Sequence, residues 1–189
     1  MGYKKETIRT TVFQRVLVPV LMLTVYSLLL FLFSGCGYHI AGKGGSMPGE
    51  IKTVSIPFFK NLTQRPGVET VITTAIVDEF INIESIKVVS VEESEAVFIG
   101  SIKSYVLTPV SFDRTDVTQE YRLSIEVEFT LLRRSDNKTL WQVSNLSDYE
   151  DFKVNTLDVD ATKTAEWDAL KKMAKDMARL VKEQIVEDF

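Results

Sequence analysis

Apolar and polar residues alternate most regularly between Tyr121 and Leu131. In an extended strand, the apolar side chains at the odd positions would point to one face and the polar side chains at the even positions to the other. This pattern is typical of an antiparallel strand with one buried and one solvated face. The polar run Ser135–Lys138 predicts a turn, and Thr139–Tyr149 predicts the strand that returns beside the first.

Other segments have the patterns of strands and helices. Short alternating or β-branched runs predict three more strands, at Ile51–Phe59, Ile86–Val91 and Ala96–Leu107. We expect Pro57 to place the end of the first strand at an edge or a turn. Apolar residues at helical spacing predict two helices, at Val68–Ile83 and Asp160–Val186. Asp158 or Asp160 can cap the second helix, and the polar stretches Asn61–Gly67 and Asp113–Thr118 predict loops.

The order of these elements predicts the fold class. A strand and a helix are followed by four strands and a last helix, which favours an antiparallel or mixed sheet covered by helices on one side. We therefore expect an α+β domain over residues 51–189. It would be a two-layer sandwich, in which two helices pack on one face of an about four-stranded, mostly antiparallel sheet.

The first 35 residues have the three parts of an export signal. Basic residues at positions 4, 5, 9 and 15 precede an uncharged apolar run over residues 16–33, and Ser34 and Gly35 lie directly before Cys36. The apolar run is also long enough to span a membrane, so a membrane-anchored chain with an incidental cysteine is the alternative.

Cys36 favours the export signal. The segment Phe33–Cys36 resembles a lipobox, where a signal is cleaved before a cysteine that carries lipid, although Phe33 stands where leucine is usual. We expect a lipoprotein signal peptide over 1–35, lipidation of Cys36 and a flexible glycine-rich tether over 36–50. Gly37 stands where aspartate would retain such a protein in the inner membrane, so we expect the outer membrane.

The charge of the mature chain excludes general nucleic-acid binding. The signal holds four of the 22 basic residues and one of the 26 acidic residues, which leaves 18 basic and 25 acidic residues and a net charge of −7. Nucleic-acid binding needs a basic field. An anionic ligand would have to be held by a local group of basic side chains.

The sequence offers little catalytic chemistry. The single histidine, His39, lies in the tether, so it cannot complete a metal cluster or a Ser-His-Asp set in the folded domain. The acidic runs 92–95 and 148–151 lack the spacing of a calcium loop, and the glycines before residue 50 lack the Gly-Lys-Ser/Thr of a phosphate loop. We expect no cofactor, no metal and no enzymatic activity.

Four motifs in order resemble one family. They are Cys36–His39 directly after the signal, Ile56–Thr63 followed by Pro66–Glu69, Thr118–Arg122 at the start of the alternating strand, and Leu140–Trp141 on the next strand. Together they resemble LptE, the lipopolysaccharide-assembly lipoprotein family. The resemblance covers nearly all of residues 36–189, and the order and spacing of the motifs carry it.

The resemblance implies a function and a site. It implies a non-enzymatic lipoprotein of the outer membrane that sits as a plug in the LptD β-barrel, helps to assemble it and takes part in placing lipopolysaccharide in the outer leaflet. It also implies contact with lipopolysaccharide through basic residues, which by local match are Arg114 and Lys163. The alternative function is a lipid-anchored envelope scaffold or ligand-binding module unrelated to lipopolysaccharide.

Overall fold

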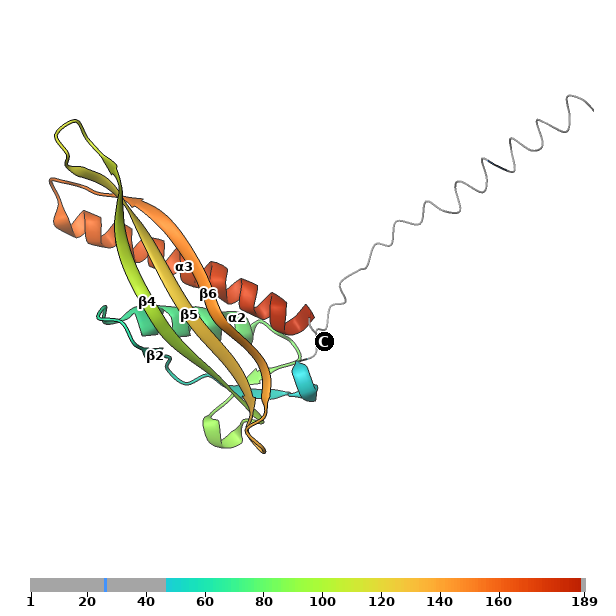
Figure 1. The fold of residues 1–189 in the computed structure, drawn as a ribbon. Coiled ribbons are helices and arrows are strands. Elements are labelled where there is room, and N and C mark those ends of the chain that lie inside the picture. Colours follow the sequence, from blue (N-terminus) through green and yellow to red (C-terminus); the bar gives the residue numbers. More distant parts are fainter. Residues whose placement is uncertain (1–25, 27–46, 188–189) are drawn as a thin grey trace, which may run out of the picture. The chain divides into compact units, whose positions relative to one another are not determined.

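The computed structural model describes residue 26 and residues 47–187 (Figure 1). The predicted signal peptide, Cys36 and most of the tether lie outside the described residues. The elements of the folded unit follow in chain order. They are η1 (Pro48–Glu50), β1 (Thr53–Ser55), β2 (Lys60–Asn61), α2 (Val68–Ile81), β3 (Lys87–Val88), η2 (Val91–Glu93), β4 (Ala96–Phe112), β5 (Thr118–Arg133), β6 (Thr139–Lys153) and α3 (Val159–Glu187).

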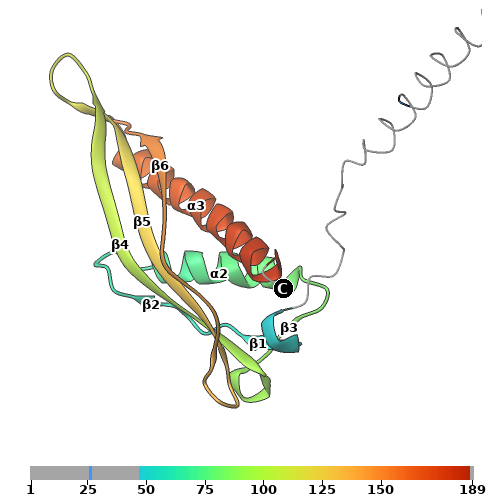
Figure 2. The ribbon, with the colours of Figure 1, turned by 45° about the vertical axis from the view of Figure 1, so that its right-hand side comes forward.

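The predicted α+β class is confirmed, with a mixed sheet of six strands rather than about four. The strand order is β3-β1-β4-β5-β6, and β2 pairs separately with β4. The three long strands β4, β5 and β6 are antiparallel, whereas the short strands β1, β2 and β3 form parallel pairs. Both helices lie on the same face of the sheet, as Figures 1 and 2 show from two directions.

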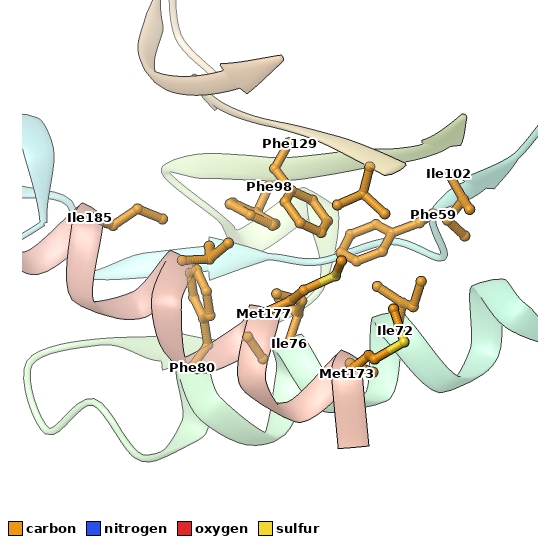
Figure 3. Packing of buried hydrophobic residues seen from close by; sticks show 14 of the residues in the cluster. Phe59, Ile72, Ile76, Phe80, Phe98, Ile102, Phe129, Met173, Met177 and Ile185 are labelled. Atoms are coloured by element: carbon orange, nitrogen blue, oxygen red, sulfur yellow. The ribbon is translucent and has the colours of Figure 1, made fainter. Parts of the chain in front are cut away.

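The core lies between the helices and the alternating strand. The odd positions of β5 from Leu123 to Leu131 are buried, as the alternation predicts. Phe98 on β4 lies at the centre of an aromatic cluster, with ring centroids 5.0 Å from Phe80 and 5.4 Å from Phe129 (Figure 3). Each buried ring of this size stabilises the fold by about 1.5–3 kcal/mol through the apolar surface removed from water.

Local sequence sets where the helices begin. Gly67 directly before α2 has φ +88°, a conformation that favours glycine. The carboxylate of Asp158 accepts a hydrogen bond of 2.9 Å from the backbone N–H of Ala161, so of the two candidates Asp158 caps α3. The buried face of α3 carries apolar side chains at helical spacing. They are Leu170, Met173, Met177, Val181 and Ile185.

The first strand is shorter than the sequence predicts. Only Thr53–Ser55 of the expected strand Ile51–Phe59 pairs as β1, because the chain turns away through Pro57. The backbone N–H of Phe59 instead donates a hydrogen bond of 3.1 Å to the side chain of Thr73 on α2. The buried Phe59 ring thereby enters the core from a non-strand segment.

The folded unit begins before Ile51. Met47 is buried, and the 3-10 turn Pro48–Glu50 packs beside β6. The last four residues of the expected tether, 47–50, therefore belong to the domain. In the part of the chain that the structure describes, no helix has both the length and the apolar character needed to cross a membrane.

Candidate functional site at the distal end of the hairpin

The hairpin of β4 and β5 reaches beyond the layer of helices. Past Tyr105, the β4 residues from Val106 to Val110 are all exposed. The loop Asp113–Val117, which we call the hairpin tip, connects the two strands at the far end. In Figures 1 and 2 the first turns of α3 lie at this same end, while the turn between β5 and β6 lies at the opposite end.

Asp113 organises the hairpin tip. One of its carboxylate oxygens accepts hydrogen bonds from the backbone N–H of Thr115 at 2.7 Å, the hydroxyl of Thr115 at 2.7 Å and the N–H of Val117 at 3.0 Å. The hydrogen bonds from Thr115, and then that from Val117, lower the pKa of Asp113 because they favour the ionised form. The negative charge of Asp113 is thus bound within its own loop.

Arg114 is exposed at the hairpin tip and forms no hydrogen bond or ion pair with another described residue. Other basic side chains of these strands are already paired. Arg122 holds Asp151 through two hydrogen bonds of 2.8 Å, and Lys103 lies 2.8 Å from a carboxylate oxygen of Glu128. The guanidinium of Arg114 is therefore available to a ligand.

Lys163 lies near the start of α3 and is held only weakly. Its ammonium is 3.5 Å from a carboxylate oxygen of Asp160, and the two side chains are 61% and 92% exposed. An ion pair this open to water contributes little to stability, because solvent screens it and both side chains lose freedom in forming it. Lys163 can exchange Asp160 for an anionic ligand at little cost.

A short series of hydrogen bonds connects the hairpin tip to the start of α3. The side-chain amide of Gln119 donates to Asp113 at 3.4 Å, and the carbonyl oxygen of Gln119 accepts from the N–H of Val154 at 2.9 Å. The next residue, Asn155, donates its N–H to the hydroxyl of Thr162 at 2.9 Å. The structure therefore brings Arg114 and Lys163, 49 positions apart in sequence, to one end of the domain.

Exposed apolar side chains border this end, and the sequence patterns did not single them out. We call them the apolar rim; they are Val110, Phe112, Val117, Leu157 and Val159. Phe112 is 55% exposed and Leu157 is 96% exposed. Exposed apolar side chains at one end suit contact with a ligand or partner that itself has apolar surface. For Val110 and Phe112, the signal was the alternation of apolar residues with Thr108 and Ser111 beyond Leu107.

The face of the sheet away from the helices is mostly polar and carries ion pairs, although Ile99 and Val106 of β4 are also exposed on it. The Arg122–Asp151 pair lies beside the ring of Tyr149, with the guanidinium carbon 4.3 Å from the ring centroid. Its hydrogen bonds lower the pKa of Asp151. On the neighbouring part of this face, the side-chain hydrogen bond from Lys103 lowers the pKa of Glu128. The polar, even positions of β5 lie on this face, as the alternation predicts, and the face suits contact with a polar surface.

The distal end can bind charge and apolar surface together. Among the described residues, no three His, Cys, Asp or Glu side chains are grouped to hold a metal ion. The groups at this end include the weakly engaged cations Arg114 and Lys163 and the apolar rim, which together match an amphiphile with anionic groups.

These features define a two-layer α+β domain with an exposed, apolar-edged end at which Arg114 and Lys163 lie. The model of the lipopolysaccharide-assembly family LptE matches residues 51–185, more than half of the chain. The chain therefore belongs to the LptE family. None of the curated proteins compared with the chain matches it.

Solved structures of bacterial proteins resemble the folded domain. The rare lipoprotein B of Shewanella oneidensis is 16% identical, with a TM-score of 0.51, and the match covers 72% of this chain and 96% of that one. A Xanthomonas campestris protein is 12% identical, with a TM-score of 0.50 and coverage of 76% and 89%. Lipoprotein B of Nitrosomonas europaea is 21% identical, with a TM-score of 0.48 and coverage of 79% and 90%. At these identities the first two matches show the fold alone.

Proposed function

We propose that this chain is an outer-membrane lipoprotein that binds lipopolysaccharide at the distal end of its hairpin and acts as plug and assembly partner of an LptD β-barrel. The observation that supports ligand binding is the placement of Arg114 and Lys163 at one end, where neither side chain is firmly held by the domain. Family membership supplies the class of ligand. Lipopolysaccharide presents phosphates to such cations and acyl chains to an apolar rim.

The polar sheet face supports the barrel partner. The lumen of an outer-membrane barrel is polar, so a protein seated in it needs a hydrophilic exterior. The charge pairs Arg122–Asp151 and Lys103–Glu128 supply one on the face that the helices leave open. Lipidation of Cys36 would tie the domain to the membrane surface from which the barrel opens.

The ligand proposal is tested with charge-reversed variants of the full chain. Arg114→Glu combined with Lys163→Glu is compared with Lys87→Glu combined with Lys138→Glu, a control that reverses two exposed bases away from the hairpin tip. We expect the first pair to lower the affinity for lipopolysaccharide by at least about tenfold, since charge-assisted contacts contribute about 1.5–3 kcal/mol each. Equal affinity of the two double variants would overturn the proposal.

The anchor and the partner are tested in cells. Cys36→Ala should abolish palmitate labelling, and persistent labelling would refute the signal interpretation.

Pull-down from detergent-solubilised outer membrane should return a large β-barrel with the unmodified chain. A stable domain that returns no barrel would instead favour an envelope scaffold or ligand-binding module.

A further inference from the structure

Glu166 is a buried carboxylate that the proposed function does not use. It lies on α3 four positions before Leu170, on the face turned toward the sheet, and it is only 6% exposed. One of its oxygens accepts a hydrogen bond of 2.9 Å from the guanidinium of Arg65. The other accepts a hydrogen bond of 2.5 Å from the hydroxyl of Tyr105. We call these three residues the Glu166 clamp.

The Glu166 clamp joins three segments that are far apart in the chain. Arg65 lies in the loop between β2 and α2, Tyr105 on β4 and Glu166 on α3, with sequence separations of 101 and 61 residues from Glu166. The Arg65 guanidinium also lies 5.5 Å from the ring centroid of Trp167. The carbonyl of Arg65 accepts a hydrogen bond of 2.8 Å from Asn61, so the loop that presents Arg65 is itself held.

The clamp lies where the hairpin leaves the helices. Tyr105 is the last β4 residue before the exposed stretch Val106–Val110 that leads to Arg114. Lys163 lies three positions before Glu166 on the same helix, about one turn away. The Tyr105–Glu166 hydrogen bond thus joins the strand that carries one ligand-binding base to the helix that carries the other.

The chemistry of the clamp is costly if its only role is stability. Burying the carboxylate of Glu166 carries a desolvation penalty. Its attraction to the guanidinium of Arg65, whose side chain is 37% exposed, only partly offsets this penalty. Directional hydrogen bonds add a defined geometry that apolar packing would not impose. Burial, followed by the hydrogen bond to Glu166, raises the pKa of Tyr105, so its hydroxyl remains a donor at all physiological pH values.

We propose that Glu166 is a positioning residue: by holding Tyr105 and Arg65, it fixes the hairpin tip relative to the start of α3 so that Arg114 and Lys163 engage one lipopolysaccharide molecule together. This inference rests on the proposed function of the distal end. It assigns a role to a cluster that makes no contact with the ligand itself.

The test measures how the two bases depend on each other. Lipopolysaccharide affinity is measured for Arg114→Ala, Lys163→Ala and the double variant, first in the otherwise unmodified full chain. If both bases hold one ligand, the double variant binds only slightly more weakly than either single variant, because losing one base already misplaces the ligand for the other. The same three variants are then made in chains that carry Tyr105→Phe or Glu166→Gln.

Tyr105→Phe keeps the ring and removes only the hydroxyl donor, so it tests the clamp even where Glu166→Gln fails to fold. We expect it to weaken lipopolysaccharide binding several-fold, by up to about tenfold. In this background, the affinity lost by the double variant should equal the product of the fold-losses of Arg114→Ala and Lys163→Ala. Tyr149→Phe is the control, since this tyrosine is exposed on β6, and it should change neither quantity.

The outcomes separate the two proposals. If Tyr105→Phe leaves both the affinity and the dependence between the bases unchanged, the positioning role of Glu166 is overturned while the ligand site stands. If neither Arg114→Ala nor Lys163→Ala weakens binding in the unmodified chain, both proposals are overturned. A purely structural role of the clamp would lower the free energy of unfolding and leave the dependence between the bases as it was, which also overturns the positioning role.

Discussion

The ring of Phe59 occupies the space that a side chain at Gly100 would need. A Cβ atom built on Gly100 would lie 2.7 Å from Cδ1 of Phe59 and 2.9 Å from Cδ1 of Phe129, closer than real Cβ contacts. Phe59 and Phe129 are themselves in contact, with ring centroids 5.2 Å apart. The absence of a side chain at position 100 is what lets the segment after β1 insert its ring against the long strands.

Gly100→Ala should therefore destabilise the domain. The added methyl group must displace one of two buried rings, and such overpacking costs about 1–3 kcal/mol in the free energy of unfolding. Urea unfolding followed by tryptophan fluorescence measures the change, with Ser101→Ala on the same strand as the control. Equal midpoints for the two variants would contradict the close approach of Phe59.

Thr73→Val should remove the acceptor for a buried backbone donor. The Thr73 hydroxyl is the partner of the Phe59 N–H, and valine has nearly the same shape without the oxygen. An unsatisfied buried donor costs about 1–3 kcal/mol. Thr74→Val, at the neighbouring exposed position of α2, should change the free energy of unfolding by no more than about 0.5 kcal/mol. Similar losses in both variants would argue against the hydrogen bond.

Phe98→Ala should produce a large loss of stability. The ring is fully buried and contacts four other aromatic rings, which are those of Phe59, Phe80, Phe129 and Trp141. Truncation of a buried phenylalanine costs about 3–5 kcal/mol, because a cavity remains. Phe112→Ala on the same strand is the matched control, since that ring is largely exposed. The free energies of unfolding of the two variants, measured by chemical denaturation, should differ by most of this amount.

The hairpin tip should loosen in acid through Asp113. Its pKa in the folded loop is lowered by the hydrogen bonds from Thr115 and Val117. The ionised carboxylate therefore stabilises the loop at pH values above the ordinary aspartate pKa of about 3.9, and this contribution is lost as the pH falls through the lowered pKa. The amide NMR signals of Thr115 and Val117 should move together below that pH. Asp113→Ala should abolish their common transition.

Local patterns in the sequence predict the long elements well. The alternation of β5, the turn at Ser135–Lys138 and the helical spacing of α2 and α3 all depend on neighbouring residues, and each is found where the pattern places it. Strand ends were less predictable. β4 continues past Pro109 to Phe112 because the pairing with β5 shifts register between Pro109 and Ser111, which accommodates the proline.

Contacts between distant segments could not be derived from these patterns. The strands β1, β2 and β3 contain only two or three residues each, and nothing in so short a segment indicates which strand it pairs with. In the candidate site, Arg114 was predicted to lie in a loop and it does, but its placement at the same end as Lys163 follows from the tertiary structure. The one sequence signal for the Glu166 clamp was a charged residue in line with Leu170 and Met173 on the apolar face of α3.

The helices of the chain cover one face of the sheet, and side chains on the other face form ion pairs with one another. The described residues form one buried core between the sheet and the helices, so we expect the domain to complete its folding before it meets a partner. A partner would then meet a domain that is already folded. For a protein proposed to help assemble a larger barrel, this sets the order of events: the small component is ready first, and it can serve as the template on which the larger one closes.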